Sequence, residues 1–230
     1  MKRSLVLVTF LLLVLVLSVG VCNGAAVTPK WAVYDYTTTV QAPPGWEEGS
    51  NGYPMASYST IKDGALALDS TKAPDVGPTY KLKIPTPGAG FKFTAVARVK
   101  VDTPSGIGMD FDFRTGLRER IILSSSGIDL NTSKVLVETV KTTEWHTYFL
   151  AYEIVDEAGT LKLLTKVYVD GATTPVAQTA STTKDSSGYF RFGDGSSSSG
   201  YAGSIDWILW TFDGAFSPDQ VELPAGFSLK

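Results

Sequence analysis

The chain of 230 residues is poor in the side chains that most often do chemistry in enzymes, because it has one cysteine, Cys22, and one histidine, His146. A single cysteine excludes an intramolecular disulfide, so the fold must be stabilised by its core. Zinc sites built from cysteine and histidine need several such ligands, and a nucleophilic triad needs a base beside the nucleophile. The sequence therefore excludes zinc enzymes and triad hydrolases as function classes.

The chain also lacks a strong excess of charge of either sign. It has 20 Lys and Arg against 23 Asp and Glu, which gives a formal net charge of -3. No basic stripe runs along it, and such a stripe is the electrostatic footprint of a nucleic-acid partner. We therefore expect no nucleic-acid partner and a polar, largely uncharged surface.

Helical periodicity is the third absence. Alternating and β-branched runs recur instead, separated by clusters of Gly, Pro, Asn, Asp and Ser. In Phe91–Val101, apolar residues fall on one face and Lys92, Thr94 and Lys100 fall on the other, as a strand with one dry face requires. About a dozen short strands with tight turns predict one all-β domain of two packed antiparallel sheets. The expected strands are 31–40, 56–61, 65–68, 79–84, 91–101, 107–113, 118–123, 128–130, 135–139, 145–154, 161–169, 189–192 and 204–212.

The N-terminus has the pattern of a secretion signal. Lys2 and Arg3 form a basic start, and the run from Leu5 to Val21 carries no charge. We expect residues 1–24 to be the signal peptide and residues 25–230 to form one domain outside the cytoplasm or at the cell surface. A retained N-terminal anchor is the alternative, because the apolar run nearly reaches the length that spans a bilayer. Lipidation of Cys22 is a minor alternative, since Val21 is bulky for such a site.

Four motifs in the second half resemble those of a known superfamily. They are Trp145–Tyr148 (WHTY), Val167–Gly171 (VYVDG), Phe192–Gly195 (FGDG), and Asp206-Trp207 followed by Asp213–Pro218 (DGAFSP). Residues 30 to 218 resemble bacterial and archaeal concanavalin A-like lectin/glucanase proteins, including laminin-G-like domains. The resemblance implies a jelly-roll sandwich whose curved sheet offers a concave face or its rim loops to a glycan. The superfamily contains lectins, glycan-binding modules, hydrolases, lyases and adhesive domains, so the fold alone does not select a function.

The glucanase branch places Glu-x-Asp-x-Glu on one strand, and that pattern is absent here. The nearest substitute is Asp110, Asp112 and Arg114, whose Cα atoms lie about 6.6 Å apart at successive steps. Carboxyl groups at such spacing are compatible with acid and base catalysis on a glycosidic bond. Two further arginines, Arg118 and Arg120, follow a turn expected near residue 116. Charge pairing on a solvated face is therefore the favoured interpretation of this cluster.

Other candidate residues stand apart from this cluster. Trp46 lies in a Pro/Gly-rich loop, which favours an exposed ring that stacks on a sugar. Asp194, in a Gly/Ser loop, is a candidate calcium ligand, with a plain turn as the alternative. His146 and Tyr148 share a strand face and are the candidate catalytic pair of a lyase, in which one of them would act as the base. The surrounding aromatic residues favour a structural histidine instead.

These observations lead to a ranked set of hypotheses. The first is a secreted or surface-held, non-catalytic carbohydrate-binding or adhesive module, with an extracellular polysaccharide or glycan as partner. Its ligand residues are Trp46, Asp110, Asp112 and Arg114, and calcium at Asp194 is the single cofactor considered. The second is a polysaccharide-degrading hydrolase or lyase. The third is a structural subunit of a surface layer or filament.

Overall fold

The computed structural model describes residues 26–49, 53–73, 77–84, 88–102, 106–196 and 199–229. The expected signal peptide lies outside these residues. Within them the regular structure is fourteen strands and two short 3-10 turns, η1 (Met55–Ser57) and η2 (Pro218–Gln220). The all-β prediction is confirmed.

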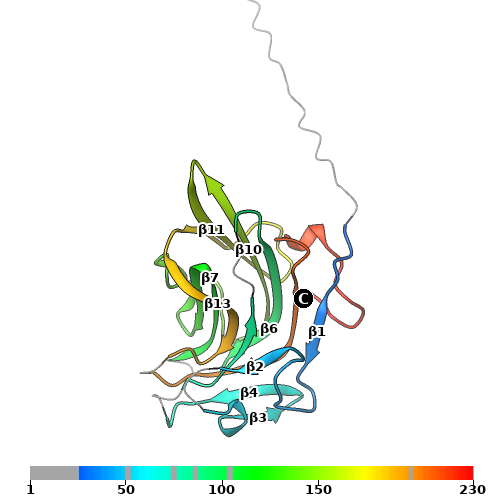
Figure 1. Cartoon of the computed structure of the whole chain (residues 1–230). Coiled ribbons are helices and arrows are strands. Elements are labelled where there is room, and N and C mark those ends of the chain that lie inside the picture. The colour runs from blue at the N-terminus through cyan, green and yellow to red at the C-terminus, as the bar shows by residue number, and fades with distance from the viewer. Residues whose placement is uncertain are drawn as a thin grey trace, which may run out of the picture.

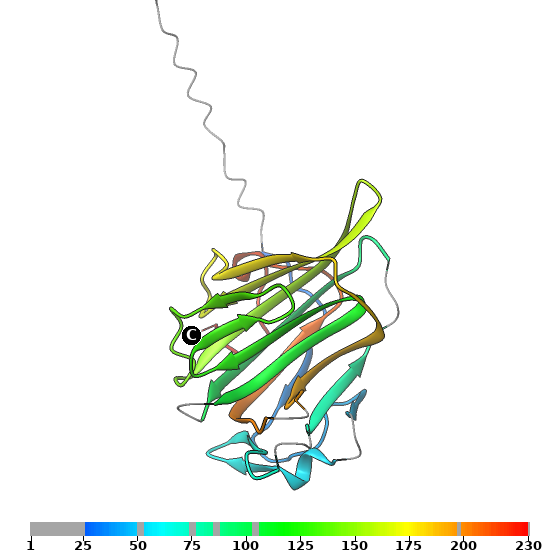
Figure 2. The same ribbon diagram turned by 90° about the vertical axis from the view of Figure 1, so that its left-hand side faces the viewer.

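The strands form two antiparallel sheets that pack face to face, as in a jelly-roll sandwich (Figure 1). The eight-stranded sheet contains, in spatial order, β12 (Ala177–Ser181), β11 (Thr160–Val169), β10 (His146–Glu157), β6 (Lys92–Val101), β14 (Ala202–Thr211), β4 (Ala65–Asp69) and β3 (Ser59–Lys62), with β1 (Ala32–Asp35) also paired to β14. The six-stranded sheet contains β2 (Trp46–Glu48), β5 (Thr79–Lys83), β13 (Lys184–Gly193), β7 (Ile107–Ser124), β8 (Gly127–Leu130) and β9 (Val135–Val137). Figure 2 shows the six-stranded sheet facing the viewer.

The core fills the space between the two sheets. Phe93 and the alternate residues after it on β6 are fully buried there, as the alternation predicts. Phe111 and Phe113 of β7 face them from the other sheet, and the ring centroids of Phe93 and Phe113 lie 5.6 Å apart. Aromatic pairs at such separations add to the free energy gained by burying apolar area. The inner faces thus stabilise the fold, and the outer faces are free to carry function.

Trp46 belongs to this core, so the expected exposure of its ring is wrong. The side chain is 8% exposed and packs edge-on against Phe190, Phe192 and Trp210. The Pro/Gly loop ends before it, at Gly45, whose φ of 83° permits the turn that leads into β2. A ring enclosed in this way has no free face for a sugar.

β7 is one strand of 18 residues, so the expected turn at Gly116 is also wrong. Gly116 has a φ of 77°, but it stays paired to Asp185 of β13, and the extra residues of the resulting bulge lie on β13. By contrast, the hairpin of β10 and β11 is confirmed, with Ala158 and Gly159 both at positive φ.

A second apolar cluster lies on the outer face of the eight-stranded sheet. Trp207 and Phe149 belong to it. Residues from the segment that follows β14, residues 212–229, cover them, including Phe227, and this segment is called the C-terminal segment below. The ring centroids of Trp207 and Phe227 lie 5.3 Å apart. A hydrogen bond of 3.0 Å from the indole of Trp31 to the carbonyl of Glu222 ties the segment to the start of the domain. The C-terminal segment therefore seals one half of this face.

We predict that Trp46→Ala lowers the free energy of unfolding by about 3 to 5 kcal/mol, because it leaves a large cavity in the aromatic core. Urea unfolding followed by intrinsic fluorescence measures the change. Leu136→Ala is the control, because Leu136 is 51% exposed and its truncation should cost well under 1 kcal/mol. Equal stability of the two variants would contradict the core position of Trp46.

Candidate functional site

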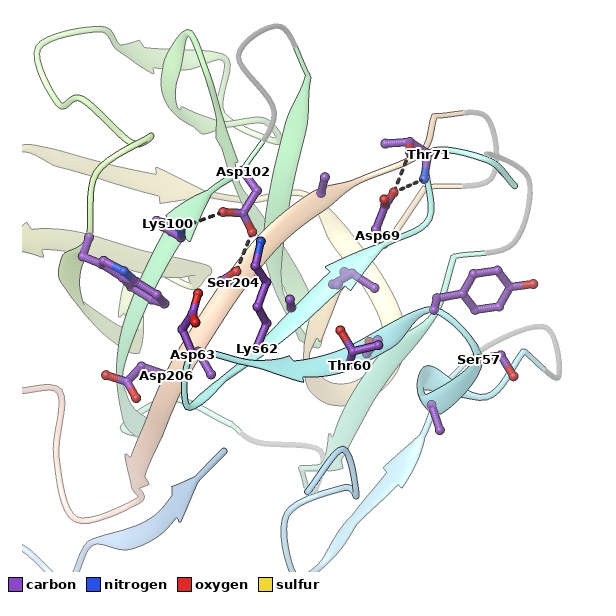
Figure 3. A pocket seen from close by; sticks show the side chains of 18 of the residues that line it. Ser57, Thr60, Lys62, Asp63, Asp69, Thr71, Lys100, Asp102, Ser204 and Asp206 are labelled. Carbon is purple, nitrogen blue, oxygen red and sulfur yellow. Dashed lines mark hydrogen bonds and ion pairs between the residues drawn. The ribbon is translucent and has the colours of Figure 1, made fainter. Parts of the chain in front are cut away.

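A polar groove lies on the half of the eight-stranded sheet that the C-terminal segment leaves uncovered (Figure 3). Its volume is about 1030 Å³, and β3, β4, β6 and β14 form its floor. Binding sites for small ligands commonly have volumes of roughly 300 to 1,000 Å³, so the groove is large enough for several sugar units.

The outward residues of β6 explain why the face divides in two. Thr94 and Val96 point outward under the C-terminal segment, whereas Arg98 and Lys100 point outward into the groove, which Asp102 also lines just after the strand. Outward side chains of a strand do not contribute to the inner core, so this switch in polarity leaves the sandwich intact. Half of the face is therefore apolar and covered, and half is polar and open.

A bulge on β14 sharpens the division. Ile205 pairs with Val99 and Trp207 with Arg98, so Asp206 is an extra residue in the ladder. The bulge puts Asp206 and Trp207 both on the outer face, the first toward the groove and the second under the C-terminal segment. Asp206 accepts a hydrogen bond of 2.6 Å from Arg98.

The groove contains as many basic as acidic side chains. Lys100 pairs with Asp102 at 3.0 Å, and Arg98 with Asp206. Figure 3 shows Lys62, Asp102 and Ser204 toward one end and Asp69 with Thr71 at the other. Lining charges are Lys62, Lys72, Arg98, Lys100, Asp63, Asp69, Asp102 and Asp206. Serine and threonine hydroxyls lie between them, so the groove offers neutral and charged hydrogen-bonding groups without net charge.

Trp145 is one of two described aromatic residues that line this groove, and Tyr58 is the other. The Trp145 side chain is half-buried, and cations of β6 lie over the ring, with the Arg98 guanidinium at 4.8 Å and the Lys100 amine at 5.4 Å from the centroid. Such cation–π contacts hold the indole in one orientation. Sequence analysis missed this residue as a candidate because the WHTY run favours packing.

The sequence-predicted residues Asp110, Asp112 and Arg114 lie on the other sheet, on the outer face of β7. Asp112 is fully buried and accepts hydrogen bonds from Arg114, Arg118 and Arg191 at 2.7 to 3.1 Å. Asp110, also fully buried, accepts one of 2.6 Å from Arg120. The expected charge pairing is thus present, along β7 and across to Arg191 of β13, but the expected solvated face is wrong because both carboxylates are buried.

These contacts require β7 to curve strongly. Ten residues separate Asp110 from Arg120, and in a straight strand their Cα atoms would lie about 33 Å apart. The two side chains nevertheless meet, so the outer face of the six-stranded sheet must be concave along β7. The curvature brings the arginines over the carboxylates and encloses both of them.

Asp194 lies at the end of this cluster. Its carboxylate accepts hydrogen bonds from the Ser70 hydroxyl at 2.5 Å and the Ser196 backbone at 2.8 Å. Burial raises its pKa to about 6, although both hydrogen bonds act in the opposite direction. Calcium at Asp194 stays a prediction. Within the described ranges, no group of three or more acidic, His or Cys side chains converges on a point.

His146 is held by two acceptors. Its Nδ1 lies 2.6 Å from a carboxylate oxygen of Asp170, and its Nε2 lies 3.1 Å from the carbonyl oxygen of Lys141. Both ring nitrogens are therefore engaged with protein oxygens at hydrogen-bonding distance. Tyr148 is fully buried. This geometry favours the structural interpretation of the histidine over a lyase pair.

Comparisons with known proteins identify the fold and nothing finer. No protein-family model and no curated protein matches the sequence. Among solved structures, apo Crh5 transglycosylase aligns over 85% of this chain and 92% of its own with a TM-score of 0.53 and 9% identity, and the Crh5 complex with NAG gives 0.53 and 10%. An engineered GH43 hydrolase with endo-xylanase and exo-arabinofuranosidase activity aligns over 79% of this chain and 40% of its own, with a TM-score of 0.53 and 14% identity.

At these identities the likeness shows the fold alone, a β-sandwich of the kind that the concanavalin A-like resemblance implies. The laminin-G-like assignment stays a prediction. In the part of the chain that the structure describes, no helix is long and apolar enough to cross a membrane.

The raised pKa of Asp194 predicts a specific pH dependence. A carboxyl whose pKa is near 4 when unfolded and about 6 when folded stabilises the protein most below pH 4, and that contribution is lost as the pH rises to 6. Asp194→Asn should therefore remove part of the stability loss between pH 4 and pH 6.5, as measured by urea unfolding at both values. A variant with the wild-type slope over this window would contradict the burial of an ionisable Asp194.

Proposed function

We propose that the mature chain is an exported, non-catalytic module that binds a glycan in the groove on the eight-stranded sheet. The observation that carries the proposal is the combination, in one open groove of about 1030 Å³, of balanced hydrogen-bonding side chains with the held indole of Trp145. The fold, shared with carbohydrate-acting proteins of known structure, supports a carbohydrate ligand as an analogy.

The chemistry of the groove suits a sugar polymer. Sugar hydroxyls both donate and accept hydrogen bonds. This groove offers carboxylates as acceptors, amines as donors, and hydroxyls that can do either. An aromatic ring adds apolar contact with the C–H face of a sugar at low entropic cost. Since the lining charges balance, a neutral glycan is the class of ligand that we favour.

The groove contacts also support a non-catalytic role. Asp102 and Asp206 are each ion-paired with a basic side chain. Asp69 accepts two hydrogen bonds from Thr71, one from its backbone N–H and one of 2.5 Å from its hydroxyl. A hydrolase needs one carboxyl to act as acid and a second as base or nucleophile. Among the described groove residues, Asp63 is the one carboxylate for which no protein partner is present, so a hydrolytic pair would have to involve it.

We expect Trp145→Ala to weaken retention on a neutral polysaccharide roughly three- to tenfold, the cost of losing one aromatic contact. Affinity electrophoresis of residues 25–230 against a panel of soluble neutral polysaccharides measures it. Trp145→Phe should retain most of the binding, and Leu136→Ala, on the other sheet, should retain all of it. Unchanged retention in Trp145→Ala would contradict the assignment of the groove.

The same incubations distinguish the rival functions. Release of reducing or unsaturated ends that Asp63→Asn abolishes would overturn the non-catalytic proposal in favour of hydrolysis in the groove. Absence of retention and of product on the whole panel, together with concentration-dependent assembly, would favour a structural subunit instead.

Export is a separate prediction, supported by the Lys2-Arg3 start and the uncharged run from Leu5 to Val21. N-terminal sequencing of the protein recovered from the culture medium or cell surface should begin near Ala25. Recovery of a cytoplasmic chain that starts at Met1 would contradict it, and a membrane-bound chain that retains residues 1–24 would indicate the anchor.

A further inference from the structure

The concave outer face of the six-stranded sheet gathers arginines around its buried carboxylates. Four guanidinium groups, those of Arg114, Arg118, Arg120 and Arg191, surround the carboxylates of Asp110 and Asp112. A third carboxylate, Asp185, pairs with Arg114 at 3.2 Å. Arginines therefore outnumber the carboxylates they contact by four to three.

Several guanidinium donors also lack an acceptor. A guanidinium has five N–H donors. Arg118 uses Nε and Nη2 on Asp112, which leaves its Nη1 group, and its side chain is 27% exposed. The Arg191 side chain is only 8% exposed, and its buried Nε has no acceptor. The buried Asp110 Oδ1 in the same cluster also has no partner, so the donors that a ligand can reach are those of the exposed Nη1 group of Arg118.

Tyr189 gives the same face an aromatic platform. Its ring, on β13 next to Arg114, has the Arg114 guanidinium at 5.2 Å, the Lys81 amine at 5.6 Å and the Arg191 guanidinium at 5.8 Å from the centroid. The ring is half-buried. Charge pairing alone would account for the ion pairs, but not for a ring surrounded by three cations beside unpaired donors.

We propose that this concave face is a second binding site, which takes the carboxylate or sulfate group of an acidic sugar. Arg118 supplies its remaining donors to the oxyanion, and Tyr189 packs against the sugar ring. Guanidinium groups suit this role because their planar donor pairs match the spacing of carboxylate and sulfate oxygens. Both residues lie on the six-stranded sheet, and the groove lies on the outer face of the other sheet, so the two sites are independent.

Retention of residues 25–230 on immobilised polygalacturonate, which carries carboxylates, and on dextran sulfate, with unmodified dextran as the neutral reference, tests this proposal. We expect retention on at least one acidic polymer, and retention should fall as NaCl is raised from 50 to 200 mM. Arg118→Gln should weaken it about tenfold, the effect of losing one charge-assisted hydrogen bond pair. The polymer that is retained identifies the oxyanion.

Two further variants make the outcome specific. Lys166→Gln removes one exposed cation from the eight-stranded sheet and should leave retention unchanged, so an equal loss there would mean unspecific attraction and would overturn the proposal. Arg118→Lys keeps the charge without the planar fork and should bind with intermediate strength, while an unchanged melting temperature excludes misfolding. Trp145→Ala should not affect acidic retention, so this site can stand if the groove assignment fails. Absence of retention on both acidic polymers at 50 mM NaCl would overturn it.

Discussion

Burial of the Asp112 carboxylate is the constraint on which the shape of the molecule depends. A buried charge is tolerated only when hydrogen-bonding partners replace its water shell, and here three arginines do so. Two of them, Arg114 and Arg118, come from the same strand, so the carboxylate can be satisfied only if β7 curves. The ion-pair network therefore stabilises the concave outer face of the six-stranded sheet.

The two outer faces of the sandwich illustrate how such a fold separates stability from function. Inward side chains such as Phe93 and Phe113 make the core, and they leave the outward positions free to vary. On the eight-stranded sheet the bulge at Asp206 divides the outward positions into an apolar half, sealed by the C-terminal segment, and the polar groove. A single extra residue in one strand thus decides where the sheet is covered and where it is open.

The sequence predicted the features that depend on short-range patterns. It did not predict those that depend on contacts with residues distant in the chain. Alternation placed Phe91–Val101 correctly, and spacing by two brought Asp110, Asp112 and Arg114 together. Gly116 was misjudged because positive φ occurs in bulges as well as in turns, and pairing with β13 selects the bulge. The burial of Trp46 was not predicted, because it depends on packing against Phe192 and Trp210, which are distant in the chain. The groove, assembled from four strands, has no contiguous pattern at all.

The carboxyl groups of Asp110 and Asp112 show why a shifted pKa is not in itself a sign of catalysis. Burial raises the pKa of Asp110, whereas hydrogen bonds from Arg114 and Arg118 and the charge of Arg191 outweigh burial and lower that of Asp112. Opposite shifts in neighbouring carboxyls are typical of an acid and base pair. An acid, however, must come within about 3 Å of the oxygen that it protonates. Both carboxyls here are fully enclosed, and a side chain on Gly195 would collide with Asp110. The arginines that pair with these two carboxylates also cover them, so this face can present guanidinium groups to a ligand but not the carboxyl groups of Asp110 and Asp112.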